Sequence, residues 1–411
     1  MTSRTRRSAR VLFVVRSGGG GSLINVLLLV RYLDQERFRP TVLFYDSNPY
    51  VDDFREAGAD VRVLDSSVSV RSMSKLVPHG LRPSRSEHRV LRMARRVNRF
   101  VQRDCPVSLR IATVIRDVEA DLVQSNICPS ADRASILAAG LARVPHVSYS
   151  QYFTADEPWF DRPLSVFADR YLCISEAVRR QVIQGVRVRE DKTRLVFAPF
   201  EFPAAAGSAE AAARVRTELK LNGRHKLIAN VGRLVPWKGQ DIFLRAFAAI
   251  AEDHPDAHAL VVGSPGDNRA GVAYEAQLRD LVSELGLTGR VTLTGHRTDI
   301  EDIMSASDVV VHSSSQAEPL GRVIMEAIAL EKPVIATDGG GVPEMVRDGS
   351  SGSLVPPGDE RSMAVALRSV LDDPERAAKM AATARQQARR RFSARTFVQT
   401  LESEYDRILG I

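Results

Sequence analysis

The chain is poor in cysteine and in long apolar runs, and each shortage excludes a class of protein. Cys105, Cys128 and Cys173 have neither the number nor the spacing of a disulfide framework or a zinc site, so we expect a reducing cytoplasm. No apolar run approaches the ~18 residues of a membrane-spanning helix. The opening MTSRTRRSAR precedes an apolar stretch too short for a signal sequence, and residues 1–10 are interpreted as a basic tail.

The length of 411 residues is ample for two domains of about 150 to 200 residues each. Its 44% apolar and 26% charged residues are ordinary for a soluble globular protein. Short apolar runs typical of buried strands, beginning with residues 11–15 (VLFVV), alternate with helical stretches along the chain. This alternation predicts the α/β class with doubly wound parallel sheets.

Residues 200–214 are rich in Ala, Pro and Gly and lack apolar periodicity, which indicates a break between domains. We expect a first domain over residues 11–200, a hinge over 201–213 and a second domain over 214–391. Residues 392–411 are expected to form a terminal helix.

A glycine-rich loop, SGGGGS, follows the first predicted strand and precedes a predicted helix. Backbone N–H groups and the helix dipole make such a junction a ready site for an anion. A dinucleotide-binding fingerprint is the alternative, with Asp46 at the end of the next strand. Leu23 stands where that fingerprint needs its third glycine.

Two carboxylates, Glu318 and Glu326, stand eight positions apart in the segment SSSQAEPLGRVIMEAIAL. Pro319 biases Glu318 toward extended backbone, and Gly321 permits a sharp turn before a helix from about Arg322. Glu326 would lie roughly 6 Å along that helix, so both acids could face one ligand. The alternative is that Glu318 caps the helix and Glu326 is solvated.

This segment resembles the Glu-(seven residues)-Glu motif of the retaining family-4, or group 1, glycosyltransferases. The resemblance implies that Glu318 contacts hydroxyls of the donor sugar and that Glu326 binds the nucleotide ribose, with Leu320 and Gly321 beside the donor. The matching residues are Ser315, Glu318, Pro319, Gly321, Glu326, Ala327 and Ala329.

Arg233 and Lys238 follow a predicted strand, in a pattern that resembles the family's G-R-L-x-x-x-K-G. The resemblance implies that both cations hold the donor pyrophosphate. Fixed cations would stabilise the negative charge that builds on a departing diphosphate, Arg as a bidentate donor and Lys as a compact charge. A solvated loop is the alternative.

Two further stretches resemble parts of the donor site. The segment DGGGVPE is similar to the family's G-G-x-P-E and places Gly340, Gly341 and Val342 near the diphosphate, as a glycine cradle before a helix start. Glu344 is expected to cap or orient that helix. The loop after the strand RVTLTG implies a contact of His296 and Arg297 with the base.

The resemblance implies a GT-B architecture: two facing Rossmann-like domains with the active site in the cleft, and a last helix that crosses back to the first domain. It implies transfer of a sugar from a nucleotide-diphosphate sugar, UDP- or GDP-linked, to a hydroxyl with retention of configuration. Asp-x-Asp, the metal motif of the other major glycosyltransferase fold, is absent. We therefore expect neither a metal nor another cofactor.

The resemblance is weaker over the first domain. There it implies that the glycine loop, through Gly19 and Gly20, faces the donor phosphates. The family usually has a His after the strand ADLVQSN, where this chain has Asn126. His146 is close by but is interpreted as structural. Asn126, Gln151 and Tyr152 are the candidates for the acceptor side.

The net charge of +7 comes from one segment. Residues 82–116 contain ten Arg and two acids, a net of +8, so the rest of the chain sums to −1. A solvated helical face and docking on anionic lipid, which would bring the enzyme to a lipid-linked acceptor, are both open. Nucleic-acid binding is not expected, because no recognised motif accompanies the charge. Six arginines form one helical stripe: Arg85, Arg89, Arg92, Arg96, Arg99 and Arg103.

We therefore predict a cytoplasmic glycosyltransferase in the synthesis of cell-surface polysaccharide, a glycolipid or a glycosylated metabolite. A peripheral location on the inner face of the plasma membrane is left open. One alternative is a nucleotide-sugar epimerase of similar fold, which would turn over the donor without an acceptor. Another is a partner subunit that binds the nucleotide sugar without catalysis, which the missing His suggests.

Overall fold

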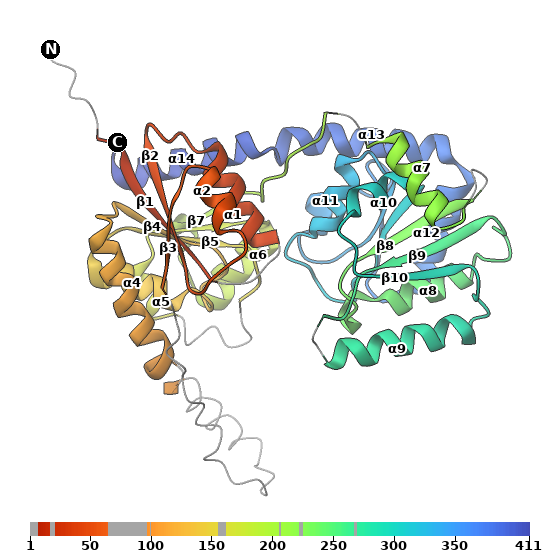
Figure 1. Cartoon of the computed structure of the whole chain (residues 1–411), viewed down its shortest axis with the longest axis horizontal. Helices are drawn as coiled ribbons and strands as arrows, with labels where there is room; N and C mark the ends of the chain where they lie inside the picture. The colour runs from red at the N-terminus through yellow and green to blue at the C-terminus, as the bar shows by residue number, and fades with distance from the viewer. Residues whose placement is uncertain are drawn as a thin grey trace, which may run out of the picture. The chain divides into compact units, whose positions relative to one another are not determined.

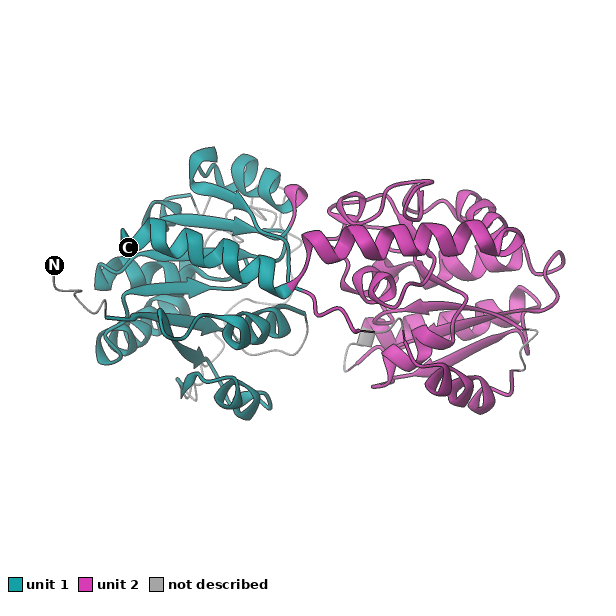
Figure 2. Ribbon diagram, turned by 90° about the horizontal axis from the view of Figure 1, so that it is seen from above, with its two compact units in different colours: residues 1–174, 178–199, 394–411 teal, residues 175–177, 200–393 magenta. Residues whose placement is uncertain are grey.

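The computed structural model describes residues 7–16, 21–64, 97–98, 100–154, 162–204, 207–221, 225–266 and 269–411. The chain divides into two compact units, which Figure 2 colours separately. Unit 1 comprises residues 1–174, 178–199 and 394–411, and unit 2 comprises residues 175–177 and 200–393. Each unit has a parallel sheet with helices on its faces, which confirms the predicted α/β class (Figure 1).

Unit 1 has a sheet of seven parallel strands in the order β3-β2-β1-β4-β5-β6-β7. β1 lies near its centre, and residues 11–15 are buried, because both faces of this parallel strand are covered. The strands are β1 (Ala9–Val15), β2 (Phe38–Phe44), β3 (Asp60–Val63), β4 (Leu122–Ser125), β5 (His146–Ser150), β6 (Arg170–Cys173) and β7 (Thr193–Leu195).

Helices of unit 1 pack on both faces of this sheet. Buried side chains of α4 and α5 form one core with alternate residues of β1, such as Leu12 and Val14. The C-terminal helix α14 packs elsewhere in the unit, where its Tyr405 contacts Phe38 edge-on at 5.5 Å between ring centres. The helices are α1 (Gly21–Tyr32), α2 (Val51–Glu56), η2 (Phe100–Asp104), α4 (Cys105–Asp117), α5 (Arg133–Ala142), η4 (Leu164–Phe167), α6 (Glu176–Gln181), η5 (Val182–Val186), η6 (Glu190–Lys192) and α14 (Ala394–Leu409). The first two residues of α6 are counted with unit 2.

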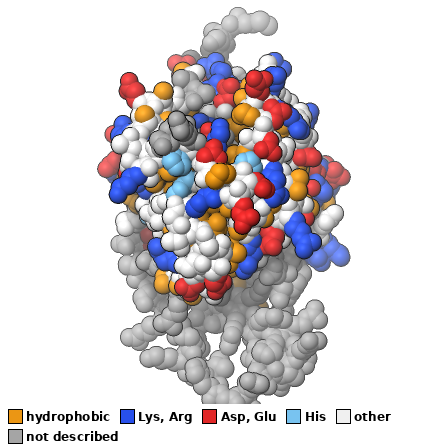
Figure 3. Space-filling model, turned by 90° about the vertical axis from the view of Figure 1, so that its right-hand side faces the viewer, with side chains coloured by type: hydrophobic (Ala, Val, Ile, Leu, Met, Phe, Trp, Pro, Cys, Tyr) orange, Lys and Arg blue, Asp and Glu red, His pale blue; other side chains and the backbone are white. Residues whose placement is uncertain are grey.

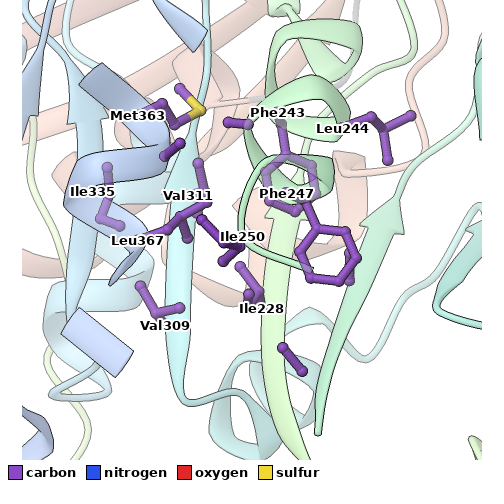
Figure 4. Close-up of a cluster of buried hydrophobic side chains, with 14 of the residues drawn as sticks. Ile228, Phe243, Leu244, Phe247, Ile250, Val309, Val311, Ile335, Met363 and Leu367 are labelled. Atoms are coloured by element: carbon purple, nitrogen blue, oxygen red, sulfur yellow. The ribbon is translucent and has the colours of Figure 1, made fainter. Parts of the chain in front are cut away.

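Unit 2 has a six-stranded parallel sheet in the order β10-β9-β8-β11-β12-β13. Neighbouring residues of one strand point to opposite faces of the sheet. Ile228 of β8 therefore packs in the core formed with α8, α9 and α12, and Leu227 packs in the core formed with α7 and α10 on the other face. Figure 4 shows the first of these cores. The strands are β8 (Lys226–Val231), β9 (Ala257–Val262), β10 (Val291–Gly295), β11 (Val309–His312), β12 (Val334–Thr337) and β13 (Ser353–Val355).

The first helix that lies wholly in unit 2, α7, starts at Ala209, within the segment 200–214 that is interpreted from the sequence as the hinge and the start of a helix. The Ser208 hydroxyl accepts the N–H of Ala211 and so caps this helix. The helices are α7 (Ala209–Glu218), η7 (Pro236–Lys238), α8 (Gln240–Ala248), α9 (Arg269–Glu284), α10 (Ile300–Ala306), α11 (Arg322–Ala329), η8 (Val342–Glu344), α12 (Glu360–Asp372) and α13 (Pro374–Arg391).

The structure describes residues 97–98 and 100–116 of the basic segment, so most of its arginine stripe lies outside the described residues. Of its six striped arginines, Arg103 is described and lies exposed at the end of η2. The face of unit 2 drawn in Figure 3 intermixes basic with acidic side chains, in keeping with a charge near zero outside the basic segment. Among the described residues, no helix combines the length and apolar character needed to cross a membrane.

Candidate active site

The candidate site lies at the carboxyl ends of three neighbouring strands in the middle of the unit 2 sheet. From β8 the chain proceeds to one edge of the sheet through β9 and β10, and then returns to the other side of β8 as β11. In open parallel sheets such a reversal leaves a crevice outside the carboxyl ends of the strands, where ligands bind. The loops after β8, β11 and β12 hold the predicted donor-site residues.

The loop after β8 carries both predicted phosphate-binding cations. Arg233 is exposed, and within the described part of the chain its side chain makes no hydrogen bond or ion pair. Lys238 ends η7, where the Ser313 hydroxyl donates to its carbonyl oxygen at 2.9 Å. The Lys238 ammonium lies 4.5 Å from the centre of the Trp237 ring. One cation is therefore available to a ligand, and the other is held against the loop that follows β11.

Glu318 is buried in the loop after β11 and accepts three hydrogen bonds at one oxygen, Oε1. The donors are the Lys238 ammonium at 2.6 Å, His312 Nε2 at 2.8 Å and the Ser314 hydroxyl at 2.5 Å. Burial alone would raise the pKa of Glu318, but attraction to His312 and Lys238 outweighs burial and holds the pKa well below its usual range. The group is thus a carboxylate at neutral pH and suited to accept hydrogen bonds from hydroxyls.

Glu326 lies on α11, eight positions after Glu318 as the motif requires, and its side chain is 30% exposed. Its Oε1 accepts a hydrogen bond from Arg322 Nε at 2.9 Å, one helical turn earlier. Burial raises the pKa of Glu326, and the charge and hydrogen bond of Arg322 partly oppose this. Leu320 and Gly321, between the two acids, are both buried. The two carboxylates therefore have opposite pKa shifts.

The glycine loop after β12 packs directly on the backbone at Glu318. The N–H of Gly341 donates to the Glu318 carbonyl oxygen at 2.8 Å. Gly340 has φ of +66°, and a Cβ added there would lie 1.9 Å from that same oxygen. Glycine is therefore required for the loop to approach the Glu318 backbone this closely. Val342 is buried at the start of η8 and anchors the loop in the core.

Glu344 does not cap the helix in which it lies. Its carboxylate accepts the backbone N–H of Glu176 at 2.9 Å and that of Ala177 at 3.2 Å, both of which belong to unit 2. The sequence interpretation is therefore corrected: Glu344 caps a backbone segment distant in sequence. The physical reason is that a helix as short as η8 has few N–H groups to satisfy, whereas residues 176–177 begin a longer helix.

The two residues expected near the base differ in their surroundings. His296 is exposed just after β10. The Arg297 guanidinium binds two carboxylates, at 2.9 Å from Nη2 to Glu218 Oε2 and 2.7 Å from Nη2 to Asp299 Oδ2. Since its donors are used in these ion pairs, a base contact by Arg297 would have to be shared with them.

The predicted acceptor-side residues lie at the carboxyl ends of β4 and β5 in unit 1. Asn126 and Gln151 are buried and joined, because Gln151 Nε2 donates to the Asn126 carbonyl oxygen at 2.9 Å. Gln151 Oε1 in turn accepts from Asn25 Nδ2 at 2.6 Å. Tyr152 is 44% exposed. Gly19 and Gly20, the other predicted residues of this unit, lie outside the described residues.

His146 lies within β5 with its ring fully buried, and burial lowers its pKa to about 3. The ring is therefore neutral at physiological pH. Its place inside a central strand supports the structural interpretation given to it from the sequence.

Sequence reasoning missed His312, Thr337 and Asn25, all of which contact predicted residues. His312 ends β11, and its segment DVVVHSS shows in the sequence only the apolar run of a buried strand. A usable signal was present: a His at the carboxyl end of a parallel strand, six positions before a motif carboxylate. Thr337 lies on the neighbouring strand, and nothing in its own segment indicated the contact.

Residues 212–387, within unit 2, match the family model described as glycosyl transferases group 1. This segment is a group 1 glycosyltransferase domain. It includes the loops after β8, β11 and β12, so the motif resemblance found in the sequence is confirmed by the family match.

Two curated relatives of the chain have the same name. The D-inositol 3-phosphate glycosyltransferase of Corynebacterium kroppenstedtii is 35% identical over 202 residues, which are 49% of this chain and 44% of that protein. The protein of the same name from Thermobispora bispora is 33% identical over 229 residues, which are 54% of this chain and 52% of that protein. The chain thus spans about half the length of the curated relatives it matches.

Solved glycosyltransferase structures are similar over nearly the whole chain. Anabaena Alr3699/HepE in complex with UDP has a TM-score of 0.78 at 24% identity, covering 97% of this chain and 99% of that one. The same Anabaena protein has been solved with UDP-glucose. A glycosyltransferase from Rickettsia africae has a TM-score of 0.79 at 18% identity, covering 98% and 99%. These likenesses confirm the predicted GT-B fold.

Proposed function

We propose that the chain is a retaining glycosyltransferase that moves a sugar from a nucleotide-diphosphate sugar to a hydroxyl acceptor. One observation carries the proposal: cations, a depressed-pKa carboxylate and a glycine loop converge at the reversal point of the unit 2 sheet. A nucleotide-diphosphate sugar presents hydroxyls to the carboxylate and a diphosphate to the cations. The residues of this site match both ends of such a ligand.

In this proposal each side chain has one task. Glu318 orients the sugar by accepting hydrogen bonds from its hydroxyls, and Glu326 accepts those of the ribose. Arg233, Lys238 and the N–H groups of the glycine loop stabilise the diphosphate as charge develops on it. The bond between the anomeric carbon and the diphosphate oxygen breaks while the acceptor oxygen bonds to that carbon on the same face. The acceptor's proton passes to the departing phosphate.

The donor is tested by thermal unfolding with UDP, GDP, ADP and TDP. A ligand that binds only the folded state at about 100-fold excess over Kd adds about 2.7 kcal/mol to the free energy of unfolding. We expect one nucleotide to raise the unfolding temperature, and the effect to shrink in Glu326→Ala and Arg233→Ala. Arg279→Ala, an exposed arginine on α9 that pairs with Glu275, is the matched control. The UDP complex of the Anabaena protein makes UDP the first choice.

The acceptor in the proposed reaction is tested separately from the donor. The curated relatives' name makes D-inositol 3-phosphate the first acceptor to test. In our proposal Asn126, Gln151 and Tyr152 lie beside the acceptor. NMR of the product's anomeric centre, with the donor's configuration known, distinguishes retention from inversion.

Asn126 stands where the family usually has a His, and this difference favours a second candidate function, that of a partner subunit without catalytic activity. A non-catalytic partner subunit would show the thermal shift with a nucleotide but form no product with any acceptor. An epimerase would convert the nucleotide sugar in the absence of an acceptor. Product analysis by mass spectrometry and NMR, with and without acceptor, separates the three activities.

Independence from metal and peripheral attachment to a membrane are further parts of the proposal. The reaction is expected to proceed unchanged in EDTA. The Arg82–Arg116 basic segment is expected to bind anionic vesicles at low salt and to release them at high salt. Equal sedimentation with neutral and anionic vesicles, or with neither, would contradict lipid docking.

A further inference from the structure

His312 is a buried histidine with both ring nitrogens in use, and the proposed mechanism gives it no task. Its side chain is 3% exposed at the end of β11. Nε2 lies 2.8 Å from Glu318 Oε1, and Nδ1 lies 3.2 Å from the Thr337 hydroxyl on β12. The imidazole at the end of β11 therefore links Thr337 to Glu318, the first carboxylate of the Glu-(seven residues)-Glu motif.

The hydrogen bonds define which nitrogen carries the proton. The Glu318 carboxylate can only accept, because its depressed pKa keeps it ionised, so Nε2 of His312 carries the hydrogen that lies between them. Nδ1 lies on the other side of the ring, within hydrogen-bond reach of the Thr337 hydroxyl. The contact with Thr337 thus holds the ring in the orientation in which Nε2 donates to Glu318.

The three donors to Glu318 all converge on Oε1 and leave Oε2 unoccupied. No hydrogen bond to Oε2 is made by any residue that the structure describes. A carboxylate held by three donors on one oxygen cannot rotate without losing all of them. Its second oxygen, with two lone pairs, is therefore presented to a ligand.

Lys238 cannot serve alone as the anchor of Glu318. In the proposed function its ammonium also stabilises the donor diphosphate, so part of its hydrogen bonding is diverted when the donor binds. His312 and Ser314 have no such second task. They are the donors that keep Glu318 in place while the diphosphate occupies Lys238.

We propose that His312, held in its orientation by Thr337, is a positioning residue that fixes Glu318 so that Oε2 accepts a hydroxyl of the donor sugar. The inference rests on the proposed function and deepens it. According to this inference, His312 and Thr337 support the extra affinity that the sugar adds to nucleotide binding.

The test is the affinity for UDP compared with that for UDP-glucose, measured by calorimetry. If the scan of nucleotides selects GDP, the pair is GDP and GDP-mannose. We expect His312→Leu to bind the nucleotide as the wild type does, but to lose about tenfold or more of the extra affinity that the sugar provides, since a hydrogen bond to a charged group is worth about that much. Thr337→Val is expected to lose part of it, and His312→Gln, which retains an N–H donor, to regain part.

His258→Leu is the matched control, because this histidine is buried in the same sheet and its Nε2 lies 2.8 Å from a threonine hydroxyl, that of Thr292. It is expected to leave the preference for the nucleotide sugar unchanged, although it too removes a His–Thr hydrogen bond, one that is partly buried. Loss of the preference in both histidine variants would overturn the inference, because it would then reflect general destabilisation of the sheet.

Two failures are distinguishable. If Glu318→Gln loses the preference but His312→Leu and Thr337→Val retain it, the positioning role is wrong and the proposed function stands. If the wild type binds no nucleotide, or Glu318→Gln keeps the preference, the proposed donor site itself is wrong. Should His312→Leu fail to fold, Thr337→Val and His312→Gln decide the question in the same way.

Discussion

At the scale of single residues, the two motif carboxylates have opposite electrostatics although they stand eight positions apart. Glu318 gains three donors in exchange for its burial, and its pKa falls. Among the described residues Glu326 has a hydrogen bond from Arg322 alone, and burial raises its pKa. The first acid is therefore stable as a carboxylate without a ligand, while the second would gain most from donors that a ligand supplies.

These shifts predict how stability depends on pH. Because the pKa of Glu318 is lower in the folded protein than the ordinary value of about 4.3, its contribution is present above that value and lost as pH falls through the folded pKa. Glu318→Gln is expected to lower the free energy of unfolding at pH 7 by about 1–3 kcal/mol, with the difference shrinking in acid. Urea denaturation between pH 3.5 and pH 7 measures it.

Glu326 is expected to behave in the opposite way. Its folded pKa is raised, so its favourable contribution is present below the unfolded pKa and lost as pH rises through the folded pKa. Glu326→Gln is expected not to lower the free energy of unfolding at pH 7, in the same urea experiment. Parallel pH profiles for wild type and both variants would show that neither shift exists in solution.

At the scale of elements, the site depends on close backbone contact between the loops after β11 and β12. Gly340 and Gly349 make this testable, because their φ angles are nearly the same, +66° and +68°, while their surroundings differ. A Cβ at Gly340 would meet the Glu318 carbonyl oxygen, and one at Gly349 would meet nothing within 4 Å.

Gly340→Ala is therefore expected to destabilise the protein more than Gly349→Ala. The control substitution costs about 1–2 kcal/mol for its left-handed backbone alone. The clash at Gly340 adds about 1–3 kcal/mol and displaces the loop, so nucleotide binding falls as well. If urea denaturation shows the same loss of stability for both variants, the loop after β12 moves to accept the added Cβ at no cost.

The elements themselves were largely predictable. Apolar runs such as residues 11–15 became central strands, and α14 lies within the terminal helix expected over residues 392–411. The family resemblance assigned Lys238 and Glu318 to one donor site, and their side chains lie 2.6 Å apart. The His312–Thr337 contact was not predictable, because it joins strands whose pairing and register the sequence does not show.

At the scale of the whole molecule, each unit has its own hydrophobic core. Phe247 on α8 is fully buried in the core of unit 2, where Figure 4 shows it among Ile228, Ile250 and Val311. Removal of the Phe247 ring should therefore destabilise unit 2 more than unit 1.

Phe247→Ala is expected to cost about 3–5 kcal/mol, since it leaves a cavity in a packed core. Hydrogen exchange followed by mass spectrometry should show faster exchange in β8, β9 and β11, with β1 and β4 of unit 1 little changed. Val365→Ala, at a 63% exposed position on α12, is the control and is expected to be nearly neutral. Equal acceleration in both sheets would mean that the units unfold together.

The return of α14 to unit 1 has a consequence for biosynthesis. Tyr405 is fully buried there and donates its hydroxyl hydrogen to Gln124 Oε1 at 2.6 Å. A ribosome makes the strands of unit 1 first, then the whole of unit 2, and only afterwards the helix that covers Phe38 and Gln124. The unit translated first is thus completed last, and a nascent chain interrupted within unit 2 exposes apolar surface of unit 1 to chaperones and proteases.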